Sequence, residues 1–198
     1  LMNEQYEMPS APAGSREGIL KGLYKFREAS STKAKAKAQL VGSGAILNEV
    51  VKAQALLDGY GVAADVWSAT SYNELYREAH RTERWNLRHP GEKPRVPYVA
   101  ECLGKGHCAV VAASDYRKSH PDMVARWVGR PMVTLGTGGF GRSEDRASLR
   151  DFFEVDARRI AAAALAALAR DEQVDAKVVK KAFADLEIQP EKADPTTV

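Results

Sequence analysis

The chain contains 198 residues, of which 44% are hydrophobic and 28% charged, and its formal net charge is +3. This length provides one ordinary domain, or two very small ones, with enough buried surface to need no metal or disulfide. The composition is typical of a soluble globular protein and excludes collagen-like, disordered and disulfide-scaffold classes; the longest apolar run, Ile160 to Ala169, is about half as long as a membrane span.

Residues 1–17 are predicted to be a linker that follows a preceding domain in a longer protein. Pro9, Pro12 and Gly14 lie in a stretch with the composition of an extended connection. This stretch lacks the charged and apolar regions of a signal peptide. The two cysteines, Cys102 and Cys108, lack the CxxC spacing and suit a reducing compartment, so we expect a cytoplasmic protein.

Residues 18–188 are predicted to form a single domain in which strands and helices alternate. The alternation at Leu23–Phe26 is typical of a short edge strand, and Ser71 with Glu74 forms a capping box that starts a helix. Further strands are expected at 39–44, 64–68, 108–112 and 131–135, and helices at 46–57, 71–83 and 121–129, with a proline-containing connection between 90 and 97.

The sequence after the last predicted strand is expected to be helical. Ser143 is predicted to cap a turn, Asp156 to cap a helix over 157–169, and Asp175 to start a final helix, with a polar tail at 189–198. Alternating strands and helices imply right-handed crossovers and a largely parallel sheet covered on both faces. The predicted fold class is therefore α/β: three α/β/α layers around a sheet of about five strands, the first of them antiparallel.

The segment Gly136–Gly141 matches the GxGxxG pattern of dinucleotide-binding proteins. That fingerprint belongs to the first strand–helix turn, and its ribose-binding acid ends a later strand. Here the motif follows the last predicted strand, and Glu154 and Asp156 lie in helical sequence. We therefore interpret the segment as a tight glycine turn.

Two other patterns are weak indications of binding. Cys102, His107 and Cys108 have no clear fourth zinc ligand, and the adjacent His107 and Cys108 would point in opposite directions in a strand. The lysine-rich segment 30–37 lacks the interleaved aromatic residues of a single-strand nucleic-acid groove. We predict packed thiols, a solvated loop, and neither nucleic-acid nor membrane binding.

Small polar residues follow the predicted strands, where ligands bind in open parallel sheets. They form a candidate strand-end crevice for a small anion or a partner: Ser43, Ser68, Ser114, Asp115 and Thr137. Small residues at these positions are also what tight connections from a strand to a helix require. A free-standing small-ligand or anion-binding α/β module is the alternative function that this crevice allows.

Several segments, read together, resemble a known enzyme family. Gly-Phe-Gly-Arg-Ser at 139–143 leads into Phe-Phe-Glu-Val-Asp at 152–156, after Glu-Arg-Trp-Asn at 83–86 and Pro-Arg-Val-Pro-Tyr at 94–98. From about Asn3 to Ile188 the chain resembles the C-terminal domain of the homodimeric, bacterial-type pyruvate dehydrogenase. More loosely it is similar to the C-terminal domain of transketolase, which has a mixed five-stranded sheet.

This resemblance implies a function for the full-length parent. The family enzyme uses thiamine diphosphate and magnesium to decarboxylate pyruvate and acetylates the lipoyl group of dihydrolipoyl acetyltransferase. The family's cofactor motif, Gly-Asp-Gly followed by Asn-Asn, is absent from this sequence. No catalytic, cofactor-binding or metal residue is therefore carried over, and no cofactor is expected in this chain.

The resemblance also implies a role and one departure from the family. The expected role is structural and assembly-related: packing on the preceding domains of its own chain, extending the homodimer and helping to shape the surface that meets the acetyltransferase. Family members usually have aspartate where this chain has Gly138. That difference puts in doubt any interaction made by the carboxylate.

Overall fold

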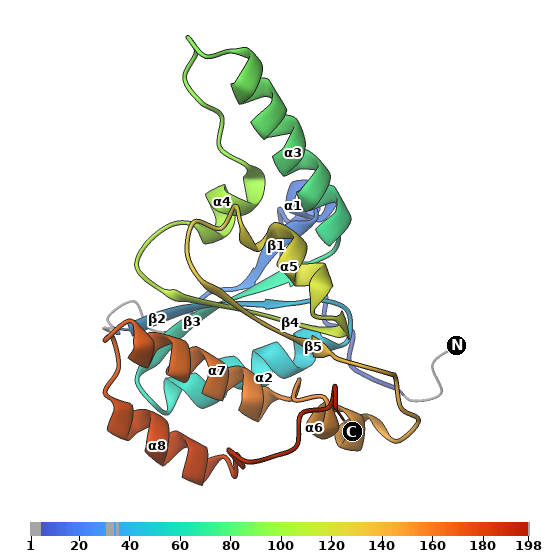
Figure 1. Ribbon diagram of the computed structural model, residues 1–198, viewed down its shortest axis with the longest axis vertical. Helices are drawn as coiled ribbons and strands as arrows, with labels where there is room; N and C mark the ends of the chain where they lie inside the picture. Colours follow the sequence, from blue (N-terminus) through green and yellow to red (C-terminus); the bar gives the residue numbers. More distant parts are fainter. Residues whose placement is uncertain (1–4, 31–33, 35, 198) are drawn as a thin grey trace.

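One sheet organises the computed structural model, which describes residues 5–30, 34 and 36–197. In this part of the chain the sheet has five strands in the order β1-β3-β2-β4-β5 (Figure 1). The first strand pairs antiparallel with its neighbour, and all other pairs are parallel. Their bounds are β1 Leu23–Arg27, β2 Ala36–Gly42, β3 Val62–Ala69, β4 Ala109–Arg117 and β5 Met132–Thr137. The predicted α/β class and the antiparallel edge strand are confirmed.

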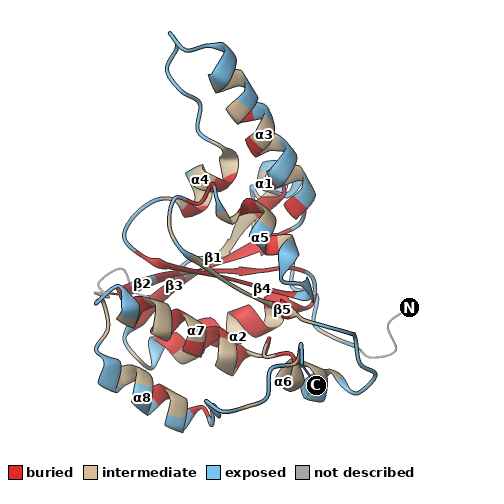
Figure 2. Cartoon of the chain, viewed as in Figure 1, coloured by how far each residue is buried: buried red, intermediate tan, exposed pale blue. Residues whose placement is uncertain are grey.

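The central strands are apolar on both faces. In β2, Leu40 packs into one core cluster and the neighbouring Val41 into the other, because successive strand residues point to opposite faces. A strand covered on both sides buries apolar residues in an unbroken run instead of an alternation. Figure 2 shows this burial along the sheet and on the inner faces of the helices.

Two helical layers cover the sheet (Figure 1). One core cluster joins α2, α7 and α8 to one face, and the other joins α3, α4 and α5 to the opposite face. Helix α1 precedes β1, and α6 lies beyond the carboxyl end of β5. The bounds are α1 Arg16–Lys21, α2 Ile46–Asp58, α3 Tyr72–Arg88, α4 Tyr98–Leu103, α5 Ser119–Ala125, α6 Arg146–Phe152, α7 Ala157–Arg170 and α8 Ala176–Asp185.

Three predicted helix starts are confirmed by their capping hydrogen bonds. The side chains of Ser71, Asp156 and Asp175 accept hydrogen bonds from backbone N–H groups in the first turns of α3, α7 and α8. Each cap satisfies a donor that the helix leaves unpaired. Helix α3 continues to Arg88, five residues beyond the predicted end.

The structure corrects other local predictions. Asp145 caps α6 instead of Ser143, because it has an extended backbone and accepts a hydrogen bond from Ser148 N. Helix α4 follows the proline-containing connection directly, and α5 ends at Ala125, before the predicted residue 129. The predicted boundary between residues 17 and 18 falls within α1.

Some predicted features lie partly outside the described residues. In the lysine-rich segment 30–37, residues 31–33 and 35 are not described, nor are residues 1–4 of the predicted linker or Val198 of the tail. Within the described ranges, no helix combines the length and apolar character needed to cross a bilayer.

Candidate functional site at the carboxyl edge of the sheet

The chain turns in opposite directions after the neighbouring strands β2 and β4. From β2 it passes through α2 to β3, and from β4 through α5 to β5, so that the two helices lie on opposite faces. Such a switch in strand order is where open α/β sheets bind ligands. The structure therefore places the candidate site at the carboxyl edge between β2 and β4.

Two predicted site residues meet at this switch point. Ser43 Oγ donates a hydrogen bond of 2.9 Å to Ser114 Oγ, which also accepts one of 3.0 Å from Tyr116 N. Both serines are buried. The pairing of their hydroxyl groups ties the end of β2 to β4.

A hollow of about 320 Å³ lies beside the serines, and it takes in two other predicted residues, Asp115 and Thr137. Ser68 does not line it: β2 separates β3 from β4, and Ser68 pairs in register with Gly42 and Tyr24. The hollow is lined by Ala45, Ile46, Asp115, Thr137, Gly141, Arg142, Arg146, Leu149, Arg150, Phe153 and Val155.

The sequence patterns did not indicate the three arginines of this hollow. They come from the loop after β5 and from α6, where Arg146 and Arg150 are spaced to share one helix face. That spacing is the signal that could have identified Arg146 and Arg150. Their positions are held by neighbours: Arg150 Nη1 lies 3.0 Å from Glu49 Oε1, and the Arg146 guanidinium lies 4.9 Å from the Tyr6 ring centroid.

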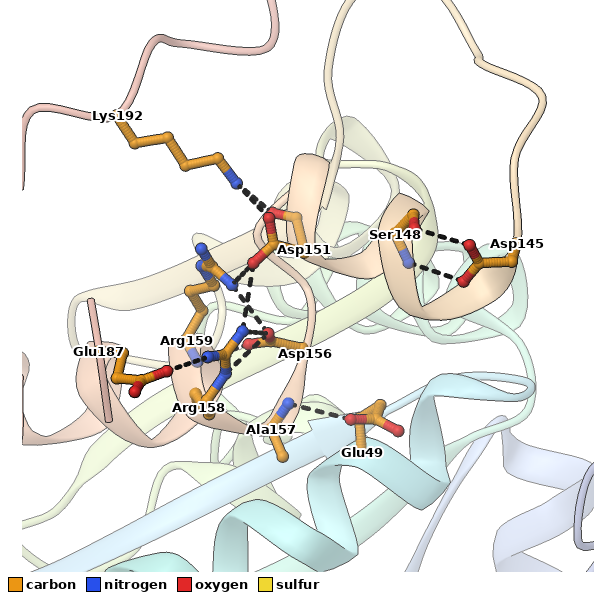
Figure 3. A network of polar contacts seen from close by, with 10 residues as sticks. All are labelled: Glu49, Asp145, Ser148, Asp151, Asp156, Ala157, Arg158, Arg159, Glu187 and Lys192. Atoms are coloured by element: carbon orange, nitrogen blue, oxygen red, sulfur yellow. Dashed lines mark hydrogen bonds and ion pairs between the residues drawn. The ribbon is translucent and has the colours of Figure 1, made fainter. Parts of the chain in front are cut away.

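A second group of charges links α6 and α7 to the C-terminal segment (Figure 3). Asp151 accepts hydrogen bonds from Arg158, Arg159 and Lys192, and Asp156 accepts from both arginines. Lys192 Nζ also donates to the backbone carbonyl of Asp151. All the groups of this network are paired with one another, which indicates a structural role: it fastens residues 189–197 to the domain.

The pH dependence of this attachment follows from the Asp151 carboxyl. Burial tends to raise its pKa, but hydrogen bonds from Arg159 and Lys192 outweigh burial and hold the pKa below its ordinary value of 3.8. The attachment should be intact above pH 3.8 and lost as the pH falls through the lowered pKa. We expect the protection factor of the Lys192 amide, which donates to the Gln189 carbonyl, to fall in that acid range.

Asp151→Asn should remove this acid-induced change and leave the Lys192 amide with little protection at neutral pH. Asp171→Asn is the matched control, because Asp171 is exposed and forms no ion pair in the described part of the chain. A wild-type profile that stays flat through the acid range would contradict the predicted linkage.

The glycine-rich turn is a close-packed connection. A Cβ atom on Gly136 would lie 2.7 Å from the Tyr116 carbonyl oxygen, and Gly139 has a φ of +68°. A Cβ on Gly138 would lie 2.7 Å from Thr196 Cγ2 of the C-terminal segment. Glycine is thus needed for backbone approach at 136, whereas the aspartate that the family resemblance leads us to expect at 138 would require the Thr196 side chain to move. No later strand follows among the described residues, as the tight-turn interpretation expects.

The cysteines, which were considered as metal ligands, lie in a different part of the fold. Cys108 is buried, its Sγ lies 3.3 Å from Arg130 Nη1, and burial raises the pKa of its thiol. Across residues 5–30, 34 and 36–197, no group of three or more His, Cys, Asp or Glu side chains is placed to hold a metal ion. The hollow offers one carboxylate, Asp115, whereas magnesium prefers several oxygen ligands. These residues do not fit a thiamine diphosphate–magnesium site.

Comparison with known families agrees with the observed architecture. The family model described as "Transketolase-like TK C-terminal domain" matches residues 22–156, from just before β1 to the cap of α7. The chain belongs to this family. This transketolase-like C-terminal domain thus includes the whole sheet and the glycine-rich turn within the matched region.

Several proteins named pyruvate dehydrogenase E1 component are close relatives of this transketolase-like C-terminal domain. The Pseudomonas aeruginosa and Haemophilus influenzae proteins are each 47% identical to it, over 197 and 196 residues, and the Escherichia coli K12 protein is 44% identical over 196. Each alignment covers 98% of this chain but 22% of the relative. The chain therefore spans about a fifth of the length of these proteins.

Solved structures support the same fold. A transketolase from Pichia stipitis superposes with a TM-score of 0.56 at 20% identity, covering 85% of this chain and 21% of that one. A transketolase from Leishmania mexicana superposes with a TM-score of 0.53 at 17% identity, covering 81% and 20%. At these identities the comparisons establish the architecture of the transketolase-like C-terminal domain.

Proposed function

We propose that this chain is the C-terminal structural and assembly domain of a pyruvate dehydrogenase E1 component. The alignment of 98% of the chain with proteins of that name, at up to 47% identity, carries the proposal. The full-length enzyme would be a cytoplasmic homodimer that decarboxylates pyruvate with thiamine diphosphate and magnesium. It would then acetylate the lipoyl group of dihydrolipoyl acetyltransferase.

The contacts within this domain support a structural role. The conspicuous polar groups at its carboxyl edge are engaged with one another: Ser43 with Ser114, Glu49 with Arg150, and Asp151 with Lys192. Catalysis requires groups that meet the substrate or the cofactor. We assign those groups to the remainder of the enzyme.

The enzymatic part of the proposal is tested on the protein made from its complete native reading frame. Pyruvate-dependent release of carbon dioxide should require both thiamine diphosphate and magnesium. A protein that ends before residue 22 should lose assembly and, as a consequence, activity. A full-length protein that binds the cofactor but does not decarboxylate pyruvate would contradict the assigned reaction.

The arginine-lined hollow favours a second candidate function, the binding of a small anion by a free-standing module. Arg142, Arg146 and Arg150 surround a partly apolar cavity at the switch point of the sheet. Titration of phosphate into the protein would give saturable heat if this function holds. Equal, non-saturating heats for the wild type and Arg150→Met would exclude it.

A further inference from the structure

Two exposed aromatic side chains lie at the carboxyl edge of the sheet, Tyr116 near the end of β4 and Phe140 in the loop after β5. Tyr116 follows the buried part of β4 and is 64% exposed, while Phe140 follows β5 and is 91% exposed. The ends of these two strands are tied together, because Thr137 Oγ1 donates a 2.8 Å hydrogen bond to the Asp115 carbonyl. Large apolar side chains grouped on a surface mark a place where another protein surface packs.

The N-terminal segment of the chain arrives at the same edge. Asn48 Nδ2, in the first turn of α2, donates a hydrogen bond of 2.9 Å to the Glu7 carbonyl, and the Tyr6 ring lies beneath Arg146. Met8, the next apolar residue, is 82% exposed. Figure 1 shows this segment beside the loop between β5 and α6, far from the projecting end of α3.

The hollow is cationic, whereas the edge around it also carries the acidic residues Glu7, Glu144 and Asp145. Three arginines and one carboxylate, Asp115, line the hollow. A carboxylate from a facing surface would gain charge-assisted hydrogen bonds from guanidinium groups that their neighbours already orient. The edge thus combines apolar anchors with a cationic hollow, as protein interfaces do.

We propose that this edge, defined as residues 6–8, 115–118 and 138–145, is the docking surface for the domain that precedes this one in the same polypeptide. Tyr116 and Phe140 are its apolar anchors, and the arginine-lined hollow receives an acidic side chain of that domain. The inference rests on the proposed function. The region aligned with this chain accounts for 22% of the length of the Pseudomonas aeruginosa relative, so most of that polypeptide lies outside it, and residues 6–8 of this chain run along the edge.

The test measures how accessible the edge is in the full-length protein. Ser143→Cys and Lys180→Cys variants are labelled with a maleimide, and the label at each site is quantified by peptide mass spectrometry. Ser143 is an exposed residue of the edge that leaves both anchors in place, and Lys180 is exposed on α8, away from the edge. Docking should make labelling at residue 143 at least about ten-fold slower than at residue 180, a difference that urea should abolish.

The outcomes distinguish the possible occupants. Labelling at residue 143 as fast as at residue 180 would show that nothing covers the edge, and protection that vanishes when the dimer is diluted to monomers would assign the edge to a second copy. Either result overturns the proposal. Pyruvate decarboxylation by the same preparations reports the proposed function separately, so an active enzyme with an unprotected residue 143 refutes the docking surface alone.

Discussion

Replacing Glu49 with leucine should lower the free energy of unfolding of this domain by about 3 kcal/mol, because it leaves a largely buried cation without its partner. The Glu49 side chain is 8% exposed and accepts hydrogen bonds from Arg150 Nη1 and from the backbone N–H of Ala157, at 3.0 and 3.1 Å. It thereby joins α2 to α6 and to the start of α7. Its third partner, Lys52, is mostly exposed and should contribute little.

Denaturant unfolding of the 198-residue chain measures this effect, and a second variant separates its causes. Glu49→Leu combined with Arg150→Met removes the unpaired charge, so it should recover about 1–2 kcal/mol of the loss. Glu74→Gln is the matched control, since Glu74 forms only exposed ion pairs with Arg81 and Arg77 and should cost less than about 1 kcal/mol. A Glu49→Leu variant as stable as the wild type would contradict this role of the contact.

The second large effect is expected at Gly42, the last residue of β2. A Cβ atom there would lie 2.8 Å from Leu47 Cα and 3.0 Å from Val50 Cγ2, so α2 packs directly on the glycine. Gly42→Val should force the helix away from the switch point and lower the free energy of unfolding by about 3 kcal/mol. The displacement should also weaken the hydrogen bond between Ser43 and Ser114.

Gly141→Val provides the control for this substitution, because a Cβ at Gly141 meets nothing within 4 Å. That variant should unfold within about 0.5 kcal/mol of the wild type. Both variants are measured by the denaturant concentration at their unfolding midpoints. Equal midpoints for the two variants would show that a larger residue at position 42 does not strain the packing of α2 on β2. That result would contradict the prediction.

The sheet could be predicted because the signals that define it are local. Apolar runs such as the one at 108–112 and side-chain caps such as Asp156 depend on neighbouring residues, and both appear in the structure close to their predicted positions. Helix α4 was missed because its sequence follows three prolines, and its stability comes from burying Val99 and Leu103 against distant elements. Tertiary packing, which the local pattern does not contain, decides such short helices.

The candidate site was predictable only in part for the same reason. Residues at strand ends, such as Asp115 and Thr137, can be located from chain order alone. Ser68 was grouped with them because the sequence does not specify strand order, and β2 separates its strand from β4. The arginines of the hollow depend on the path of the chain after β5, which turns back over the carboxyl edge before α7.

We propose that this domain is part of a pyruvate dehydrogenase and does not itself hold the cofactor. Calorimetric titration of thiamine diphosphate with magnesium tests it most directly, using the full-length protein and the 198-residue chain in parallel. The account predicts micromolar binding by the full-length protein and no saturable heat for the chain. Micromolar binding by the 198-residue chain would contradict it.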